Sequence, residues 1–438
     1  MRRLLPLLLT ASLSCQADML QALQAYQQQD FATAATKFSE LLPLGNDVAS
    51  FNLAAMALNG EGQPKNTTKA LTYLMLAAEL KHPQAAAVLQ KLSAEVPAAE
   101  LQQAQQQFQQ LQQQVKINVF TGEEEDDKLL PLPIKRMEPR YPVEAARKGL
   151  FGYVTLRLLV DEEGKVAAVD TLDAYPKHVF EKASITALKQ WRYQADGQKH
   201  IRKINLSYAL DGGVDLAKVD KTITDYKLWD AAVAGIPQHQ MVLGTLLEMV
   251  AIQSGNRPEF DASQPLSAQL DLSLFKPTPA PKAAIKGFYG YAKVSTDEKG
   301  LITKVHHFQP DVENALPELV GQQLTGKVQA GDYSLSRHKF SRQPKISVRH
   351  LQQAPLTLSS KYWWSEAAKN GDPDAQRIMA AYHDDWEQYL LSQQHAEVMA
   401  WAGTRLLLQG QREQGLQLLD QAIAKNYQLA TELKKQFL

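Results

Sequence analysis

The chain of 438 residues contains a single cysteine, Cys15, so no disulfide can form within it and no cysteine cluster can hold a metal. It also lacks an excess of either charge, because 47 basic residues balance 47 acidic ones. A basic surface of the kind that attracts nucleic acid or anionic lipid is therefore not expected. Partners must instead be recognised by local shape.

Long apolar runs are equally absent. Leu4 to Leu13 is apolar for about ten residues after a basic start, whereas a membrane span needs about twenty. This pattern predicts a secretory signal peptide over 1–17, cleaved after Ala17, and a soluble mature protein in an oxidising compartment, which we expect to be the periplasm. The alternative is lipidation of Cys15, which would give an outer-membrane lipoprotein. Cleavage is the expectation because Ser12-Leu13-Ser14-Cys15 lacks the leucine that opens a lipobox.

Catalytic motifs are missing as well. The sequence has no His-Glu-x-x-His, no Gly-x-Ser-x-Gly and no phosphate-binding glycine loop. His306 and His307 fall on a predicted strand, where neighbours face opposite sides, and His383 with its two following aspartates suits a polar helix surface. We therefore predict no enzyme, no catalytic residues, no metal and no cofactor.

The centre of the chain has the pattern of a β-hairpin. Residues 153–160 alternate with period two, which predicts a strand with one face toward a core. Asp161 to Gly164 supplies turn residues, and Val166 to Leu172 returns as a second strand.

A helix and a last strand are predicted to follow the hairpin. Phe180, Ala183, Ala187 and Trp191 recur at spacings of three and four, so a helix would place them on the apolar face of the hairpin. Residues 203–210 alternate again, which predicts a strand that could lie at the edge of the sheet.

The residues that mark turns and the ends of helices and strands in this region occur in a specific order. They are Pro139, Tyr141-Pro142, Gly149, Gly152, Asp161 with Gly164, and Ala187 with Trp191-Arg192-Tyr193. From about Leu132 to Gly212 this order resembles the C-terminal domain of TonB, the periplasmic energy transducer of Gram-negative bacteria. The resemblance implies a small α/β binding module for an extended receptor peptide. Glu138 departs from the family, which often has Gln there. Trp191 is also typical of a residue that only fills the core.

Helical repeats are predicted on both sides of this domain. Ala22 to Leu42 resembles a tetratricopeptide helix pair, and Asn52 to Ala86, with its Gly60-Glu61-Gly62 turn, resembles the related Sel-type repeat. Gln102 to Gln114 predicts an exposed helix. Residues 123–127 form an acidic run, as in a solvated linker.

The chain also repeats itself. Ala231-Ala232, Gly235, Pro237 and Gln240 recur 136 residues later, and so do the turn residues of the hairpin, as Asp297-Glu298 and Gly300. Just upstream the offset is 138, which a two-residue deletion in the first strand would explain. We infer a duplication whose second TonB-like copy is degenerate. That copy keeps the hairpin and a last strand at Ile346 to Val348, but Pro317 interrupts its helix.

The predicted fold class is therefore α+β, with a TonB-like domain, a degenerate second copy and all-α repeats. The predicted segments are 1–17 signal peptide, 18–95 helical repeats, 96–131 Gln-rich helix and acidic linker, 132–213 TonB C-terminal-like domain, 214–256 helical repeat, 257–282 linker, 283–350 degenerate TonB-like domain and 351–438 Sel-type repeats.

Two functions fit this organisation. In the first, the TonB-like domain is an accessory of TonB-dependent transport that binds an outer-membrane receptor peptide, or another periplasmic protein, as an added strand. In the second, the chain is a periplasmic scaffold whose helical repeats bind the partner. The predicted partner-binding residues are Glu138, Pro139, Arg140, Tyr141, Pro142, Arg202, Lys203, Ile204, Asn205, Leu206, Ser207 and Tyr208.

Overall fold

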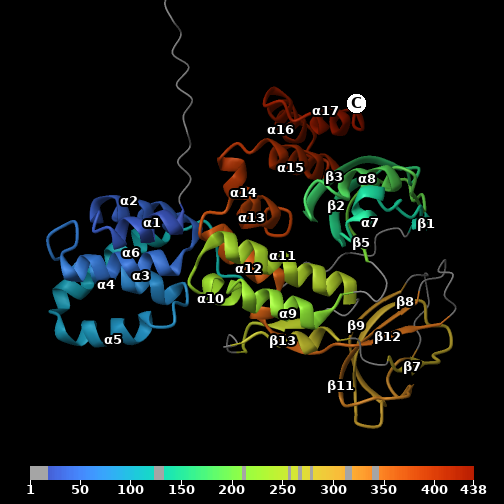
Figure 1. Ribbon diagram of the computed structural model, residues 1–438, viewed down its shortest axis with the longest axis horizontal. Helices are drawn as coiled ribbons and strands as arrows, with labels where there is room; N and C mark the ends of the chain where they lie inside the picture. The colour runs from blue at the N-terminus through green and yellow to red at the C-terminus, as the bar shows by residue number, and fades with distance from the viewer. Residues whose placement is uncertain are drawn as a thin grey trace, which may run out of the picture. The chain divides into compact units, whose positions relative to one another are not determined.

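A computed structural model describes residues 18–122, 133–209, 214–254, 258–264, 269–276, 280–310, 318–337 and 345–438. The predicted signal peptide with Cys15, the acidic run and Pro317 lie outside these residues. The chain divides into two compact units (Figure 1). The first runs to Val119 and includes Gly235–Pro237 and Glu366–Pro373, and the second comprises the rest.

The first unit is helical. Its helices are α1 (Met19–Gln27), α2 (Phe31–Leu41), α3 (Asp47–Asn59), α4 (Thr67–Glu79), α5 (Ala85–Glu95) and α6 (Ala98–Gln112), with a 3₁₀ turn at Leu42–Leu44. Asp18, Asp30, Asn46 and Asn66 cap α1 to α4 by accepting backbone N–H groups. Gly62 has φ +71°, and a Cβ there would lie 2.9 Å from Cβ of Phe31. The glycine turn therefore lets successive helix pairs approach closely.

The Gln-rich segment is part of this unit. It forms most of α6, which is largely exposed, but Ala104 is buried and its carbonyl accepts the hydroxyl of Thr72 on α4 at 3.3 Å. The helix that the sequence predicts to be exposed therefore packs against α4 at one of its turns.

The second unit begins with a three-stranded sheet. Its elements are β1 (Pro133–Lys135), α7 (Val143–Arg147), β2 (Gly152–Val160), β3 (Val166–Tyr175), α8 (Glu181–Leu188), β4 (Arg192–Tyr193) and β5 (His200–Tyr208). The sheet order is β3-β2-β5 with antiparallel pairs, and β1 pairs with β4 separately. The hairpin, the helix and the last strand are as predicted. Gly164 closes the hairpin at φ +76°, where a Cβ would lie 2.2 Å from the carbonyl oxygen of Tyr193.

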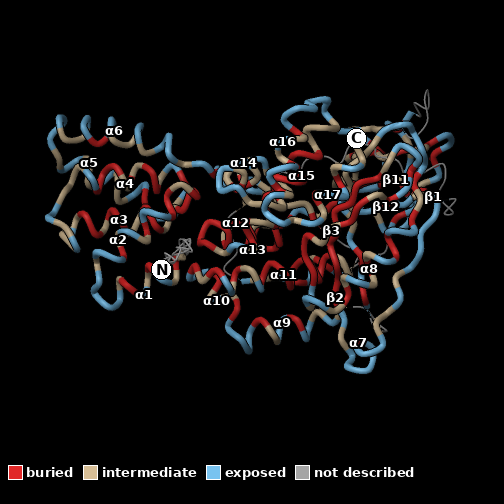
Figure 2. Tube along the Cα trace, turned by 90° about the horizontal axis from the view of Figure 1, so that it is seen from above, coloured by how far each residue is buried: buried red, intermediate tan, exposed pale blue. Residues whose placement is uncertain are grey.

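Strand β2 is buried on both faces, whereas the sequence predicted one (Figure 2). Val154, Leu156, Leu158 and Val160 face α8 and share a core with Phe180, Leu188 and Trp191. On the other face Leu159 packs in a cluster with Trp401, and Tyr153 in a cluster with Leu247. The prediction was wrong because residues distant in the sequence, Leu247 and Trp401 among them, cover the second face.

A second sheet follows three helices. The helices are α9 (Leu216–Asp225), α10 (Leu228–Val233) and α11 (Pro237–Ser254). The strands are β6 (Glu259–Asp261), β7 (Lys282–Ala283), β8 (Gly290–Thr296), β9 (Ile302–Pro310), β10 (Leu324–Thr325), β11 (Gly331–Arg337), β12 (Ser347–His350) and β13 (Gln353–Pro355). The four-stranded order is β12-β11-β8-β9 (Figure 1). In the stretch for which the sequence predicts a linker, β6 pairs with β13 and Phe275 is buried.

The strand pairings of the first sheet recur in the second. β8 and β9 form the hairpin as β2 and β3 do, β11 adds to β8 as β5 adds to β2, and β10 pairs with β7 as β4 pairs with β1. The predicted last strand was misplaced. β11 occupies that position, and β12, which includes Ser347 and Val348, lies outside it as a fourth strand.

Helices complete the chain. They are α12 (Ser360–Lys369), α13 (Pro373–Met379), α14 (Asp384–Ser392), α15 (Ala396–Leu408), α16 (Arg412–Ala424) and α17 (Leu429–Lys435). A glycine with positive φ and a proline at the next helix start recur, as Gly235 with Pro237 and as Gly371 with Pro373. Among the described residues, no helix is both long and apolar enough to cross a bilayer.

Candidate partner-binding edge

Strand β5 lies at one border of the first sheet. It pairs along its whole length with β2, from Gly152 opposite Tyr208 to Val160 opposite His200. Within the described residues no other strand pairs with β5. Lys203, Asn205 and Ser207 are exposed, whereas Leu206 and Tyr208 are buried in the core beside α8. The strand thus has one inner ladder, one outer border and a clear alternation of its faces.

The segment before α7 is held beside this strand by two aromatic residues. The Tyr141 ring lies edge-on to Phe180 at 5.5 Å and to Tyr208 at 5.7 Å, and its hydroxyl donates to the carbonyl of Leu150. Burial raises the pKa of Tyr141. Trp191 is buried, and its Nε1 donates to the carbonyl of Met137 at 2.9 Å. These contacts account for both aromatic positions by packing.

Two residues of the predicted site are in contact in the structure. Tyr141 contacts Tyr208, while Glu138 and Arg140 are exposed on either side of half-buried Pro139, in the segment that leads to α7. The structure thus places Tyr141 against β5, and Glu138 and Arg140 at the surface.

Two contacts link β5 to other parts of the second unit, one through the side chain of Lys203 in its first half and one at its last residue. Lys203 Nζ donates to the carbonyl of Ala381 at 2.9 Å and lies 4.3 Å from the Tyr382 ring centre. At the other end, Gln253 Nε2 lies 3.4 Å from the carbonyl oxygen of Tyr208. The stretch between these contacts, Ile204 to Ser207, is the part of the outer border that an added strand could reach.

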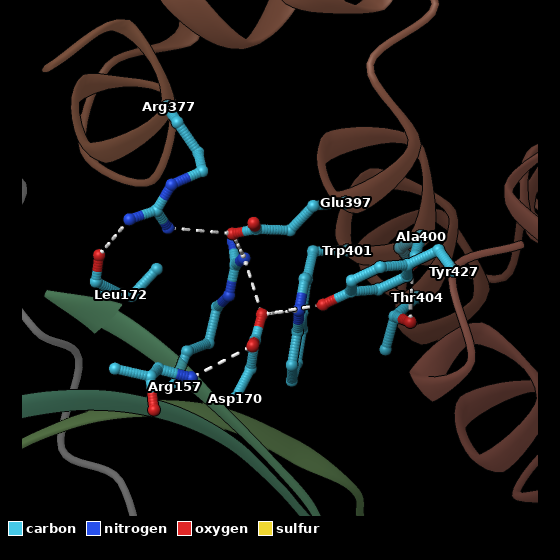
Figure 3. Close-up of polar contacts among 10 residues, drawn as sticks. Arg157, Asp170, Leu172, Arg377, Glu397, Ala400, Trp401, Thr404 and Tyr427 are labelled. Atoms are coloured by element: carbon cyan, nitrogen blue, oxygen red, sulfur yellow. Dashed lines mark hydrogen bonds and ion pairs between the residues drawn. The ribbon is translucent and has the colours of Figure 1, made fainter. Parts of the chain in front are cut away.

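A buried polar cluster joins the opposite face of the sheet to the C-terminal helices (Figure 3). Asp170 on β3 accepts hydrogen bonds from Trp401 Nε1 and the Tyr427 hydroxyl, each at 2.8 Å. Arg157 on β2 lies 3.5 Å from Asp170 and 3.2 Å from Glu397, with its guanidinium 4.4 Å from the Trp401 ring centre. Burial raises the pKa of Glu397. Because each carboxylate has donors, the charges are compensated out of water.

The same helices reach the other border of the sheet. Arg377 on α13 bridges Glu397 at 3.2 Å and donates to the carbonyl of Leu172 on β3 at 2.7 Å (Figure 3). Helix α17 also packs against β3. One outer carbonyl of β3 is thus occupied by a side chain, which leaves β5 as the more accessible border.

The two adjacent histidines of β9 do not face opposite sides as predicted. A register shift at Lys293 places His307 opposite Lys293 while His306 Nε2 lies 2.6 Å from the Ser295 hydroxyl, on the same face. The prediction missed this β-bulge. The Asp332 carboxylate lies 3.5 Å from the same Nε2. A Ser-His-Asp relay needs the two ring nitrogens of the histidine to face different partners, whereas Ser295 and Asp332 both lie beside Nε2 of His306. Within the described parts of the chain, no three His, Cys, Asp or Glu residues form a metal-binding group.

Comparison with known proteins agrees with this geometry. The profile of the family described as Gram-negative bacterial TonB protein C-terminal matches residues 137–210. This segment is a TonB C-terminal domain. It is 32% identical over 82 residues to Protein TonB of Klebsiella aerogenes, and 30% identical over 82 residues to that of Salmonella typhimurium. Each match covers 19% of this chain and 34% of the relative.

The comparison with solved structures also gave a match. The solution NMR structure of the Pseudomonas aeruginosa TonB C-terminal domain matches 20% of this chain and 92% of its own length, at 19% identity and a TM-score of 0.18. The TonB relatives are thus matched over about a third of their length. The identification of the TonB C-terminal domain within the chain rests on the family profile and the sequence matches.

The sequence analysis missed the residues of the polar cluster. Arg157 stands at a position that a half-buried strand turns to solvent, and Asp170 at a similar one. Trp401 was assigned to a helical repeat with no link to the sheet. A charged residue inside an otherwise apolar strand was the available signal, since a buried charge requires a partner.

Proposed function

We propose that this protein is a non-enzymatic, periplasmic member of the TonB-dependent transport apparatus that binds the extended TonB-box segment of an outer-membrane receptor. The segment adds as a strand to the outer border of β5. The observation that carries the proposal is that β5, the last strand of a TonB C-terminal domain, is paired on one side only within the described residues.

Strand addition suits this border physically. Backbone hydrogen bonds from the partner supply affinity without regard to sequence, and alternate side chains supply register. A residue of the partner that faces the core side would lie beside Leu206 and Tyr141, where apolar surface is available. A residue that faces the other side would lie beside exposed Asn205 and Ser207.

Disulfide trapping tests the location. In a Cys15→Ser background, Asn205→Cys provides the only thiol, and a synthetic peptide with the TonB-box segment of a receptor from the same organism carries one cysteine. We expect at least tenfold more mixed disulfide at position 205 than in the control Thr186→Cys, which is exposed on α8. Equal trapping at the two positions would contradict strand addition at β5.

The scaffold function has one observation in its favour. A groove of about 610 Å³ lies in the helical unit between α2, α3 and α4, lined by residues that include Ala35, Ser39, Glu61, Lys69 and Tyr73. Concave surfaces of this kind bind peptides in repeat proteins. In this alternative the groove binds the partner. Tyr73→Ala with Lys69→Ala then abolishes capture of the receptor peptide, and Asn205→Cys traps the peptide no more than Thr186→Cys does.

A further inference from the structure

The second sheet contains a strand border that corresponds to β5, but in that sheet another strand covers it. β11 adds to β8 as β5 adds to β2, and β12 then pairs with the outer side of β11. The paired residues are Tyr333 with His350, Ser334 with Arg349, Leu335 with Val348 and Ser336 with Ser347. After β5, in contrast, the next described element is helix α9.

The two borders can be superposed on their glycines. Gly290 opposite Arg337 in the second sheet corresponds to Gly152 opposite Tyr208 in the first. The stretch of β11 that β12 covers, Tyr333 to Ser336, then corresponds to Ile204 to Ser207. This is the stretch of β5 that lies between the contacts made by Lys203 and Tyr208. The occupied length in one sheet thus equals the accessible length in the other.

We propose that β11 is a second strand-acceptor border and that β12 is its built-in occupant, so that, of these two borders, the one on β5 is left open within the described residues. The inference rests on the proposed function only in taking strand addition as the way these sheets bind partners. Strand β12 has the chemistry of an added strand. Ile346 and Val348 are buried in the core of the second sheet, while Ser347 and Arg349 are exposed.

Besides its ladder with β11, β12 packs against β7 and buries Val348 in the core of the second sheet. The N–H of Leu351 donates to the carbonyl of Asp332 at 2.8 Å, and the His350 ring lies 4.8 Å from that of Tyr333. With four residues against seven in β11, it is the shorter partner of this pair. A short outermost strand with a ladder on one side only is expected to open before the sheet beneath it.

The test adds β12 to the protein as a separate peptide. Val348→Asp puts a carboxylate into the apolar core of the second sheet and so releases the strand, with Val348→Ile as the matched control. The probe is a peptide with the sequence of residues 345–351 and a cysteine in place of its serine. In a Cys15→Ser background, the released chain with Ser336→Cys is expected to trap this peptide at least tenfold more than the Val348→Ile chain with the same cysteine.

The trapping site separates this inference from the proposed function, because a peptide bound at β5 cannot react with Cys at position 336. Equal trapping by the released and control chains would overturn the inference. So would trapping at Thr303→Cys, which is exposed on the opposite border strand β9, as strong as at Ser336→Cys.

A measurement on the unaltered protein covers the case in which Val348→Asp prevents folding. Amide hydrogen exchange in β12 should be at least tenfold faster than in β8 and β11, because β12 opens alone. Exchange at one common rate in all three strands would show that β12 is an inseparable part of the sheet and would overturn the inference.

Discussion

Replacing Asp170 by alanine should detach the C-terminal helices from the TonB C-terminal domain. The change removes the acceptor of two hydrogen bonds, from Trp401 and Tyr427, and one of the two carboxylates beside Arg157. Hydrogen bonds to charged groups contribute about 1.5–3 kcal/mol each, so we expect a loss of about 3–6 kcal/mol in the local stability of this face.

Hydrogen exchange followed by mass spectrometry measures this loss where it occurs. Since each 1.4 kcal/mol is about tenfold in an equilibrium constant, exchange in α15 and α17 should accelerate by about two to four orders of magnitude. Exchange in α3 and α4 of the first unit should not change. The local measurement is needed because a chain with two compact units need not unfold in a single two-state step.

Two controls sharpen the result. Asp170→Asn keeps an oxygen acceptor and should cost about 1–2 kcal/mol. Asp225→Ala breaks an exposed pair with Lys221 and should cost less than about 1 kcal/mol. An acceleration below threefold in α15 and α17 for Asp170→Ala would refute the reasoning that this cluster holds the helices on the sheet.

Three further predictions concern folding and pH. In urea unfolding, Gly164→Ala should destabilise the second unit by at least about 3 kcal/mol, because the new Cβ meets the Tyr193 carbonyl. The control Gly197→Ala has the same φ of +76° but open space around it, and should cost about 1–2 kcal/mol. Trp191→Phe should cost about 1–2 kcal/mol and speed exchange around Met137, since the indole donor is lost; unchanged exchange there would contradict this contact. Burial, aided by the charge of Glu366, raises the pKa of Asp47 from 3.8 to about 6, so the helical unit should lose stability as pH rises from about 4 through 6. Asp47→Asn should remove this pH dependence in urea titrations at pH 5 and 7.5. An unaltered pH dependence would contradict the assignment.

The TonB C-terminal domain was predictable because its signals are local. The alternation of β2, the turn ending at Gly164 and the stripe from Phe180 to Trp191 each act within a few residues and together specify the hairpin and its helix. The same holds for the glycine-proline helix starts at Gly235 and Gly371.

The parts that were not predictable depend on contacts distant in sequence. The second buried face of β2 depends on Trp401, and no local pattern marks that pairing. Strand β11 was missed although Tyr333 and Leu335 alternate with serines, because nothing local in the sequence shows which strand pairs with β8. Its neighbour β12, with Ile346 just before it and Val348 within it, shows a similar alternation and took its place in the prediction.

Hydrogen exchange with and without the receptor peptide tests the central claim most directly. Strand addition predicts that amides between Ile204 and Tyr208 become protected when the TonB-box peptide is added, while the helices that line the groove near Tyr73 exchange as before. Protection confined to α2, α3 and α4, with β5 unchanged, would contradict the account and favour the helical repeats as the binding surface.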